Sequence, residues 1–550
     1  MLFPTVAFAI FFLLAYVGRW ALARRPLPLK LFLLAASYVF YGWWDWRFLG
    51  LIAGSSAVNH LLALAMARHA HGRPIGRLLG LGTVVLTLPP LTAQALIRAG
   101  AGARLAAGVG LGPEIGANTL WCAAGALAFV LAGRVASLFG AGLYDAPPAR
   151  VRTGMARALG GGAVIVNLGF LGFFKYYGFF VQNAYALCGR LGLSCPLPLL
   201  DIVLPVGISF FTFQALSYVL DVHRGEIAPA PSLLDFAIYL AFFPQLVAGP
   251  IVRARVFLPQ LIRLPVPDRL DVGRAAVLIF GGLFKKVVVA NFLAQSIVDP
   301  VFGHPAIYGA WDTLFAVYAY AVQIYCDFSA YSDIAIGTAL LLGFHFPINF
   351  DAPYFSASVQ AFWRRWHISL SSWLRDYLYI PLGGSRCSPR RTYLNLFLTF
   401  LLGGLWHGAG WTFIAWGALH GFYLCVERLL RGGRPPPPSS FGRRLAGQLV
   451  TFHLVCLSWF FFRAESFEDA WTLLGNFGQW ARPECLNLPV LAMAVLGFAS
   501  QGLDGRRVER WWDAFGRWPT WAQALAAAAA LTVILGLGPR GVAPFIYFQF

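Results

Sequence analysis

Two histidines are the residues of this chain best suited to do chemistry. His407 lies in Trp-His-Gly-Ala-Gly-Trp, within a run from Tyr393 to Val426 that contains no Asp, Glu, Lys or Arg. Such a run predicts burial in a membrane, where an ionisable side chain usually faces a protein interior or a polar cavity and marks function. His367 comes earlier, in Trp-Arg-Arg-Trp-His. Because imidazole titrates near neutral pH, either side chain could accept the proton of a reacting hydroxyl group.

The composition predicts that these histidines belong to an all-α, polytopic membrane protein. The chain has 550 residues and is 59% hydrophobic and 12% charged, with a mean hydropathy of +0.66, whereas soluble domains carry roughly 25% charged residues. Many stretches are continuously apolar and approach the roughly 20 residues that a membrane-spanning helix needs. We therefore expect about 11 to 14 transmembrane or re-entrant helices, because segments broken by Pro or Gly need not cross fully.

The net charge of +19 is better explained by membrane topology than by nucleic-acid binding, and no nucleic-acid partner is expected. Arginine and lysine collect in loops on the cytoplasmic side of membrane proteins. Three loops hold ten of them and three alternating loops hold four, so the first set is predicted to be cytoplasmic. The cytoplasmic loops are 19–30, 66–78 and 140–157, and the outside loops are 42–47, 98–117 and 183–200.

Four consecutive prolines suggest where the chain divides. We expect a membrane domain over residues 1–430, a Pro-rich connector at 431–440 and further transmembrane helices over 441–550. Residues 394–430 read as one span or as two pieces. A further aromatic stripe recurs at steps of three and four residues and predicts a helix lying in the membrane interface. The stripe comprises Trp363, Trp366, Leu370, Trp373, Tyr377 and Ile380.

Several long motifs around the histidines resemble one known family. Residues 326–384 read CDFSAYSDIAIGTALLLGFHFPINFDAPYFSASVQAFWRRWHISLSSWLRDYLYIPLGG, and residues 402–421 read LGGLWHGAGWTFIAWGALHG. FPQLVAGPIVR at 243–253 and NLGFLGFFKY at 167–176 belong to the same set. Together they resemble the membrane-bound O-acyltransferase (MBOAT) family, in its bacterial alginate O-acetylation branch. The motifs are densest between residues 240 and 425, which is the expected catalytic core.

The resemblance implies an activity. It implies that the enzyme passes an acyl group from a cytoplasmic thioester donor, such as acetyl-CoA, to a hydroxyl acceptor on the other side of the bacterial inner membrane. His407 is then the catalytic base, and His367 orients the acceptor or stabilises the developing charge. The expected partners are an exported polysaccharide, a periplasmic acceptor or acetyltransferase protein, and membrane lipid. Ser385 departs from the Asn usual in this branch, which puts only a local turn in doubt.

Other polar residues near the motifs have two interpretations each. Arg386, Arg390 and Arg391 form a basic cluster that either binds the phosphates of the donor or only fixes topology. Four further residues either line the catalytic cavity or make contacts between helices. These are Asp327, Asp333, Asn349 and Trp406.

The cysteines do not suggest a metal site. The eight cysteines lack metal-ligand spacing, so neither a metal nor a bound cofactor is expected. Cys188 and Cys195 share a predicted outside loop, and whether they form a disulfide stays open.

Two alternative functions compete with polysaccharide O-acetylation. A D-alanyl transferase of the teichoic-acid type would use similar motifs, although the Arg-rich composition disfavours it. A transporter or flippase would also bury histidines but would do no covalent chemistry. The absence of an evident internal repeat counts against a transporter built of two halves.

Overall fold

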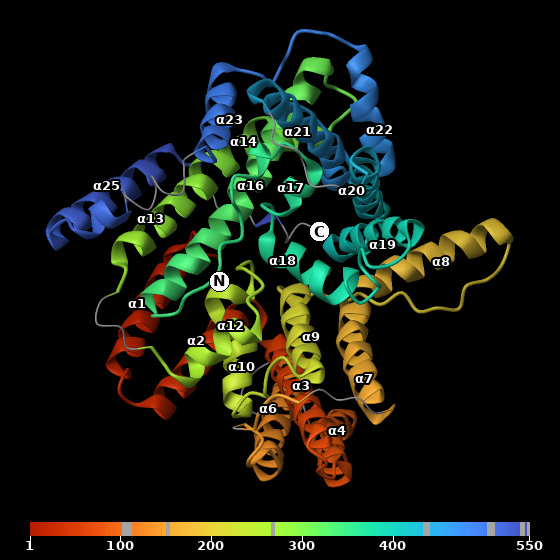
Figure 1. Cartoon of the computed structure of the whole chain (residues 1–550), viewed down its shortest axis with the longest axis vertical. Coiled ribbons are helices and arrows are strands. Elements are labelled where there is room, and N and C mark those ends of the chain that lie inside the picture. The colour runs from red at the N-terminus through yellow and green to blue at the C-terminus, as the bar shows by residue number, and fades with distance from the viewer. Residues whose placement is uncertain are drawn as a thin grey trace.

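The chain folds into helices only, as far as the structure describes it. The computed structural model describes residues 1–101, 113–144, 146–149, 154–265, 270–432, 440–502, 512–539 and 545–546. No strand occurs among these residues (Figure 1). Seven helical segments within them are long and apolar enough to cross a membrane. The prediction of an all-α, multi-pass membrane protein is therefore confirmed. The seven are Pro26–Ala70, Gly76–Arg98, Asn118–Gly140, Arg157–Leu191, Val272–Gly303, Phe441–Arg463 and Thr520–Leu537.

The N-terminal half begins with long helices and ends with short ones. Its elements are α1 (Val6–Ala21), α2 (Pro26–Asp45), η1 (Trp46–Phe48), α3 (Leu49–Ala70), α4 (Gly76–Arg98), α6 (Pro113–Gly140), α7 (Gly154–Leu171), η2 (Gly172–Tyr176), α8 (Tyr177–Leu191), α9 (Ile208–Arg224), α10 (Leu233–Ala241), α11 (Phe243–Leu246) and α12 (Ala254–Ile262). Parts of two predicted loops, at 102–112 and 150–153, lie outside the described residues.

The C-terminal half surrounds one long buried helix. Its elements are α13 (Val272–Leu283), η3 (Phe284–Ala290), α14 (Asn291–Leu293), η4 (Ala294–Val298), α15 (Asp299–Gly303), α16 (Ala310–Leu341), η5 (Pro353–Phe355), α17 (Val359–Trp363), α18 (Ile368–Leu374), η6 (Arg375–Tyr379), α19 (Pro389–His407), α20 (Trp411–Leu430), α21 (Phe441–Arg463), α22 (Phe467–Gly475), η7 (Asn476–Gly478), α23 (Leu488–Ser500) and α25 (Thr520–Leu537). The middle of the expected connector, 433–439, lies outside the described residues, and α21 beyond it packs against α16 and α20.

Helix α16 is held in the interior by two ion pairs. A wide turn of the π type, η3, carries two consecutive lysines that both face α16. Lys286 pairs with Asp327 at 2.7 Å, with both side chains nearly inaccessible to solvent, and Lys285 pairs with Asp333 at 2.5 Å. Because a lone charge is costly in a membrane interior, pairing allows α16 to carry both aspartates there.

The apolar run at 394–430 forms a tight helical hairpin of two helices, α19 and α20. Glycines let the two backbones approach closely. A Cβ on Gly404 would lie 2.3 Å from the carbonyl oxygen of Phe413, and one on Gly417 would lie 2.4 Å from that of Phe400. Helices in lipid associate mainly by such close packing, because lipid tails are as apolar as the side chains.

The aromatic stripe does not lie on one continuous helix, contrary to the prediction. The segment is helical in α17 and again from α18 onward, and His367 interrupts it with a left-handed backbone at φ 44°. The heptad-like spacing of the stripe could not reveal this break, because no Gly or Pro marks it.

Matched glycine substitutions test the hairpin. We expect Gly417→Ala to lower the stability of the protein by about 1–3 kcal/mol, because the methyl group would overlap the Phe400 carbonyl. Gly161→Ala in α7, where no atom lies within 4 Å of the new Cβ, should be neutral or stabilising by up to about 1 kcal/mol. Melting temperatures of the purified variants in detergent provide the comparison, and equal effects at both positions would contradict the packing argument.

Candidate active site

His407 is the last residue of α19 and is 4% exposed. Its ring packs edge-on against Trp416, with centroids 4.9 Å apart, and against Phe462, with centroids 5.3 Å apart. The helix stops here because Gly408 adopts an extended backbone, and a Cβ on Gly408 would lie 2.1 Å from the ring of Phe413. His407 therefore lies at a fixed break between two packed helices.

A cavity of about 190 Å³ opens beside His407. Its walls include Trp44, Lys175, Trp406 and the segment 204–210. Trp44 belongs to the predicted outside loop 42–47, and 204–210 directly follows the predicted outside loop 183–200. On the predicted topology, this cavity is therefore reached from the outside.

His367 is completely buried and belongs to a hydrogen-bond network that assigns its tautomer. Asn349 Oδ1 accepts from the Ser369 backbone N–H at 3.1 Å and from Ser369 Oγ at 2.9 Å, while Asn349 Nδ2 donates to Ser332 Oγ at 3.1 Å. The His367 Nδ1 atom lies 3.2 Å from the same Oδ1. Because Oδ1 can only accept, Nδ1 must carry the proton.

The opposite ring nitrogen of His367 is consequently a hydrogen-bond acceptor. His367 Nε2 has no hydrogen-bond partner within the part of the chain that the structure describes, and it is buried. A buried lone pair of this kind is costly unless something fills it. His367 can thus accept a hydrogen bond or a proton at Nε2, but it cannot donate one there in this tautomer.

The structure brings the two histidines to one indole. The Trp406 ring centroid lies 6.3 Å from that of His367 and 4.9 Å from that of His407, so the imidazoles are at most about 11 Å apart. Trp406 also lines the cavity. The residues are close enough to act on one substrate that reaches past Trp406.

The other predicted cavity residues have different positions. Asp327 and Asp333 are the partners of Lys286 and Lys285, and neither lines the cavity beside His407. Asn349 lies behind His367 as its hydrogen-bond acceptor. Of the four predicted cavity residues, Trp406 is the one in the cavity wall.

The predicted donor-binding arginines lie at the other end of α19. Arg386, Arg390 and Arg391 are exposed, and α19 has 19 residues, which gives a length of about 28 Å. The cluster and His407 therefore lie at opposite ends of α19.

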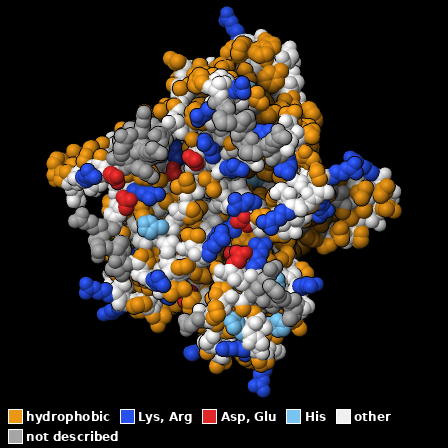
Figure 2. All heavy atoms as spheres, in the orientation of Figure 1, with side chains coloured by type: hydrophobic (Ala, Val, Ile, Leu, Met, Phe, Trp, Pro, Cys, Tyr) orange, Lys and Arg blue, Asp and Glu red, His pale blue; other side chains and the backbone are white. Residues whose placement is uncertain are grey.

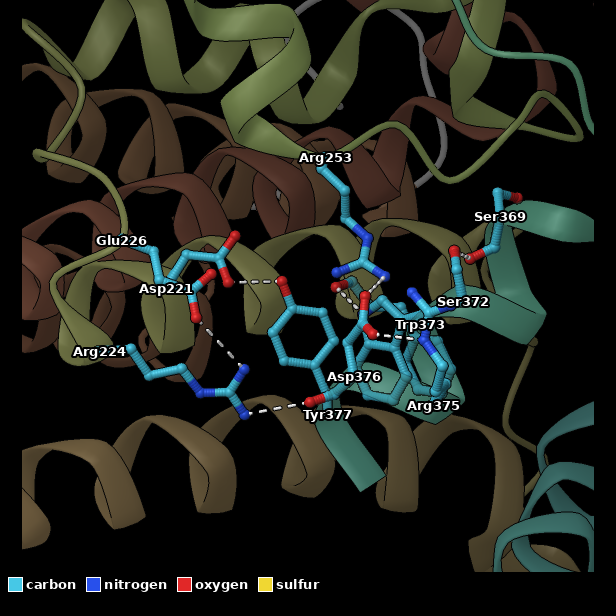
Figure 3. Close-up of polar contacts among 11 residues, drawn as sticks. Asp221, Arg224, Glu226, Arg253, Ser369, Ser372, Trp373, Arg375, Asp376 and Tyr377 are labelled. Carbon is cyan, nitrogen blue, oxygen red and sulfur yellow. Dashed lines mark hydrogen bonds and ion pairs between the residues drawn. The ribbon is translucent and has the colours of Figure 1, made fainter. Parts of the chain in front are cut away.

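A second basic cluster was not predicted. Tyr377 lies between Arg224 and Arg253, whose guanidinium carbons are 5.0 and 4.5 Å from its ring centroid (Figure 3). The Tyr377 hydroxyl donates to Asp221 Oδ1 at 2.5 Å, and Arg253 pairs with Asp376 at 3.3 Å. This network ties η6 to α9 and to the segment before α12, and so fixes the segment that carries His367.

The face of the molecule around α18 carries many basic side chains (Figures 1 and 2). Lysines and arginines cluster across the middle of that face, around the position of α18 (Figures 1 and 2). Asp376 pairs with both Arg253 and Arg375.

The sequence did contain a signal for one residue that was not chosen. Lys175 is the lone charged side chain between Ala158 and Gly189, which is the kind of isolation that singled out His407.

Cys188 and Cys195 are free thiols in the structure and form no disulfide with each other there.

The left-handed backbone of His367 gives a test that is independent of activity. Gly adopts φ 44° without strain and Ala does not, so we expect His367→Gly to be more stable than His367→Ala by about 1 kcal/mol. At His420, inside α20, the order should reverse by a similar amount, since Ala favours a helix interior. Thermal melts of the four variants decide this, and an Ala variant that is the more stable at position 367 would contradict the strained backbone.

Known proteins resemble this chain along its full length. The family described as "MBOAT, membrane-bound O-acyltransferase family" matches residues 207–464. The "Probable alginate O-acetylase AlgI" of Azotobacter vinelandii is 34% identical over 100% of both chains. The "Peptidoglycan O-acetyltransferase" of Helicobacter pylori is 32% identical over 86% of this chain and 79% of its own length. The "Teichoic acid D-alanyltransferase" of Streptococcus thermophilus is 29% identical over 48% of this chain and 69% of its own. The chain belongs to the membrane-bound O-acyltransferase family and is an O-acyltransferase.

Proposed function

We propose that this enzyme passes acetyl groups from a cytoplasmic thioester donor, such as acetyl-CoA, across the bacterial inner membrane for O-acetylation of an exported, alginate-like polysaccharide. The main support is the placement of His407 at a cavity lined by predicted outside segments, with His367 across Trp406. The full-length similarity to an alginate O-acetylase favours acetate and polysaccharide. A periplasmic acceptor or acetyltransferase protein completes delivery to the polymer.

The chemistry assigns one role to each histidine. The reacting hydroxyl of the acceptor enters the outer cavity beside His407, and a neighbouring hydroxyl of the same acceptor donates a hydrogen bond to His367 Nε2, which orients the acceptor. His407 removes the hydroxyl proton as the oxygen attacks the thioester carbonyl, so a C–O bond forms and the C–S bond breaks. The departing thiolate then takes the proton from the His407 imidazolium. General-base catalysis of this kind contributes about 10²–10⁴-fold.

The donor approaches from the opposite side of the membrane. Arg386, Arg390 and Arg391 are exposed at the N-terminal end of α19, where a phosphate-bearing carrier would meet them first. Attraction of this kind is electrostatic and weakens with salt. The thioester itself must then extend along α19 to reach the histidines.

The alternative acyl group is D-alanine. The teichoic-acid relative matches 48% of this chain, whereas the alginate and peptidoglycan relatives match most of it. We therefore favour acetyl transfer, and mass spectrometry of the modified polymer distinguishes the two groups.

We expect His407→Ala to reduce acetate in the exported polymer by at least about 100-fold, because it removes the general base. His453→Ala, which removes an exposed histidine on α21, should leave acetylation within about twofold. Acetate per polymer from chromosomal variants, with protein abundance measured in the same membranes, is the readout. Polymer that is still exported but lacks acetate excludes a simple transporter. Near wild-type acetate with His407→Ala would reject the assignment.

We expect the triple variant Arg386→Gln, Arg390→Gln, Arg391→Gln to raise the apparent donor KM about tenfold and to change kcat less. Loss of binding that is equal in the ground and transition states has this signature. The double variant Arg443→Gln, Arg444→Gln removes exposed basic residues at the start of α21 and controls for net charge. If the donor KM is unchanged in a triple variant that inserts correctly into the membrane, the arginine cluster only fixes the topology.

A further inference from the structure

The end of α19 is held by two consecutive residues from another helix. Tyr176 donates its hydroxyl to the carbonyl oxygen of Leu405 at 2.8 Å. Lys175 Nζ donates to the carbonyl oxygens of Trp406 and His407, each at 2.8 Å. The last carbonyls of a helix have no partner within it, and in a membrane they cannot rely on water. These bonds therefore satisfy three successive carbonyls, the last of which belongs to His407 itself.

Lys175 differs from the other three lysines of the chain. Lys30, Lys285 and Lys286 each form an ion pair with an aspartate, at 2.5, 2.5 and 2.7 Å. Within the described part of the chain, no carboxylate forms an ion pair with Lys175. Its charge is instead offset by the negative end of the α19 dipole. A charged group is costly inside a membrane. The contact of the Lys175 ammonium group with the carbonyls of Trp406 and His407 therefore indicates that Lys175 has a role at the candidate active site.

The local backbone is what brings Lys175 and Tyr176 to the same target. They end η2, a π-type turn between α7 and α8. Such wide turns are often found at functional sites because they redirect side chains within a continuous helix. Figure 1 shows that α8 leaves α7 at an angle at this point. The Lys175 side chain thereby reaches both the α19 end and the cavity wall.

We propose that Lys175 is a positioning residue that fixes the imidazole of His407 at the outer cavity by binding the carbonyls of the last turn of α19. The inference rests on the proposed function only in taking His407 as the base. The chain turns extended at Gly408, so no further helical turn holds His407 from the C-terminal side. Loss of Lys175 frees the turn, and a displacement of about 1 Å can cost about 100-fold in rate.

The test uses full-length protein in lipid nanodiscs and two readouts. Lys175→Met removes the donors with little change in shape, Lys175→Arg keeps a cation with donors, and Tyr185→Phe is the control. Tyr185 lies farther along α8 and donates to the carbonyl of Leu197 at 2.6 Å, away from α19. Hydrogen–deuterium exchange of the peptide covering 400–412 reports the last turn, and acetyl transfer from acetyl-CoA reports kcat and donor KM.

We expect Lys175→Met to speed exchange in this peptide about tenfold, as local opening becomes easier, and to lower kcat about 100-fold with donor KM within about twofold. In Lys175→Arg, the exchange rate of the peptide and kcat should both stay close to their wild-type values. Tyr185→Phe should change neither the exchange rate nor kcat. Exchange and kcat within about twofold of wild type in Lys175→Met would overturn the proposal, as would faster exchange with unchanged kcat.

The two hypotheses fail separately. Wild-type protein that transfers no acyl group would reject the proposed function, whereas the exchange readout still decides whether Lys175 fixes the α19 end. If Lys175→Met does not fold, Lys175→Gln provides the neutral variant, which keeps donors for the carbonyls. In Lys175→Gln, a peptide exchange rate equal to that of the wild type together with a reduced kcat would also overturn the positioning role of Lys175.

Discussion

The structure depends on one constraint: inside a membrane, every charge and every open backbone group must find its partner within the protein. The two lysines of η3 meet this requirement for the aspartates of α16. Lys175 and Tyr176 meet it for the end of α19. The contacts of Lys175 and Tyr176 join segments about 230 residues apart in the sequence, so the bonds that satisfy these carbonyls also assemble the site.

The two histidines are fixed in different ways. His367 is held by hydrogen bonds around Asn349 and by a backbone conformation that non-glycine residues rarely adopt. His407 is held by aromatic rings and through its own carbonyl. Strain of this kind persists only where the surroundings enforce it, and it concentrates at functional sites. The shared contact with Trp406 then makes one site from two separately fixed groups.

The sequence determined the class of the protein and singled out its candidate reactive residues. Long apolar runs can only be satisfied as helices in lipid, so composition alone predicted the all-α membrane fold. A histidine within a charge-free run, together with the motif around it, identified His407 and then His367. The rule that isolated His407 also applied to Lys175, although a lysine in an apolar run gives no indication of which carbonyls it will reach.

Tertiary structure decided everything that depends on contacts between distant segments. Asp327 is a structural ion-pair partner rather than a cavity residue because η3 places a lysine against it, some 40 residues away in the sequence. The break at His367 interrupts an unbroken helical pattern, and packing around Asn349 rather than local propensity enforces it. The tautomer of His367 and the lining of the cavity follow from the same cause, since helical periodicity describes one element and carries no information on which elements meet.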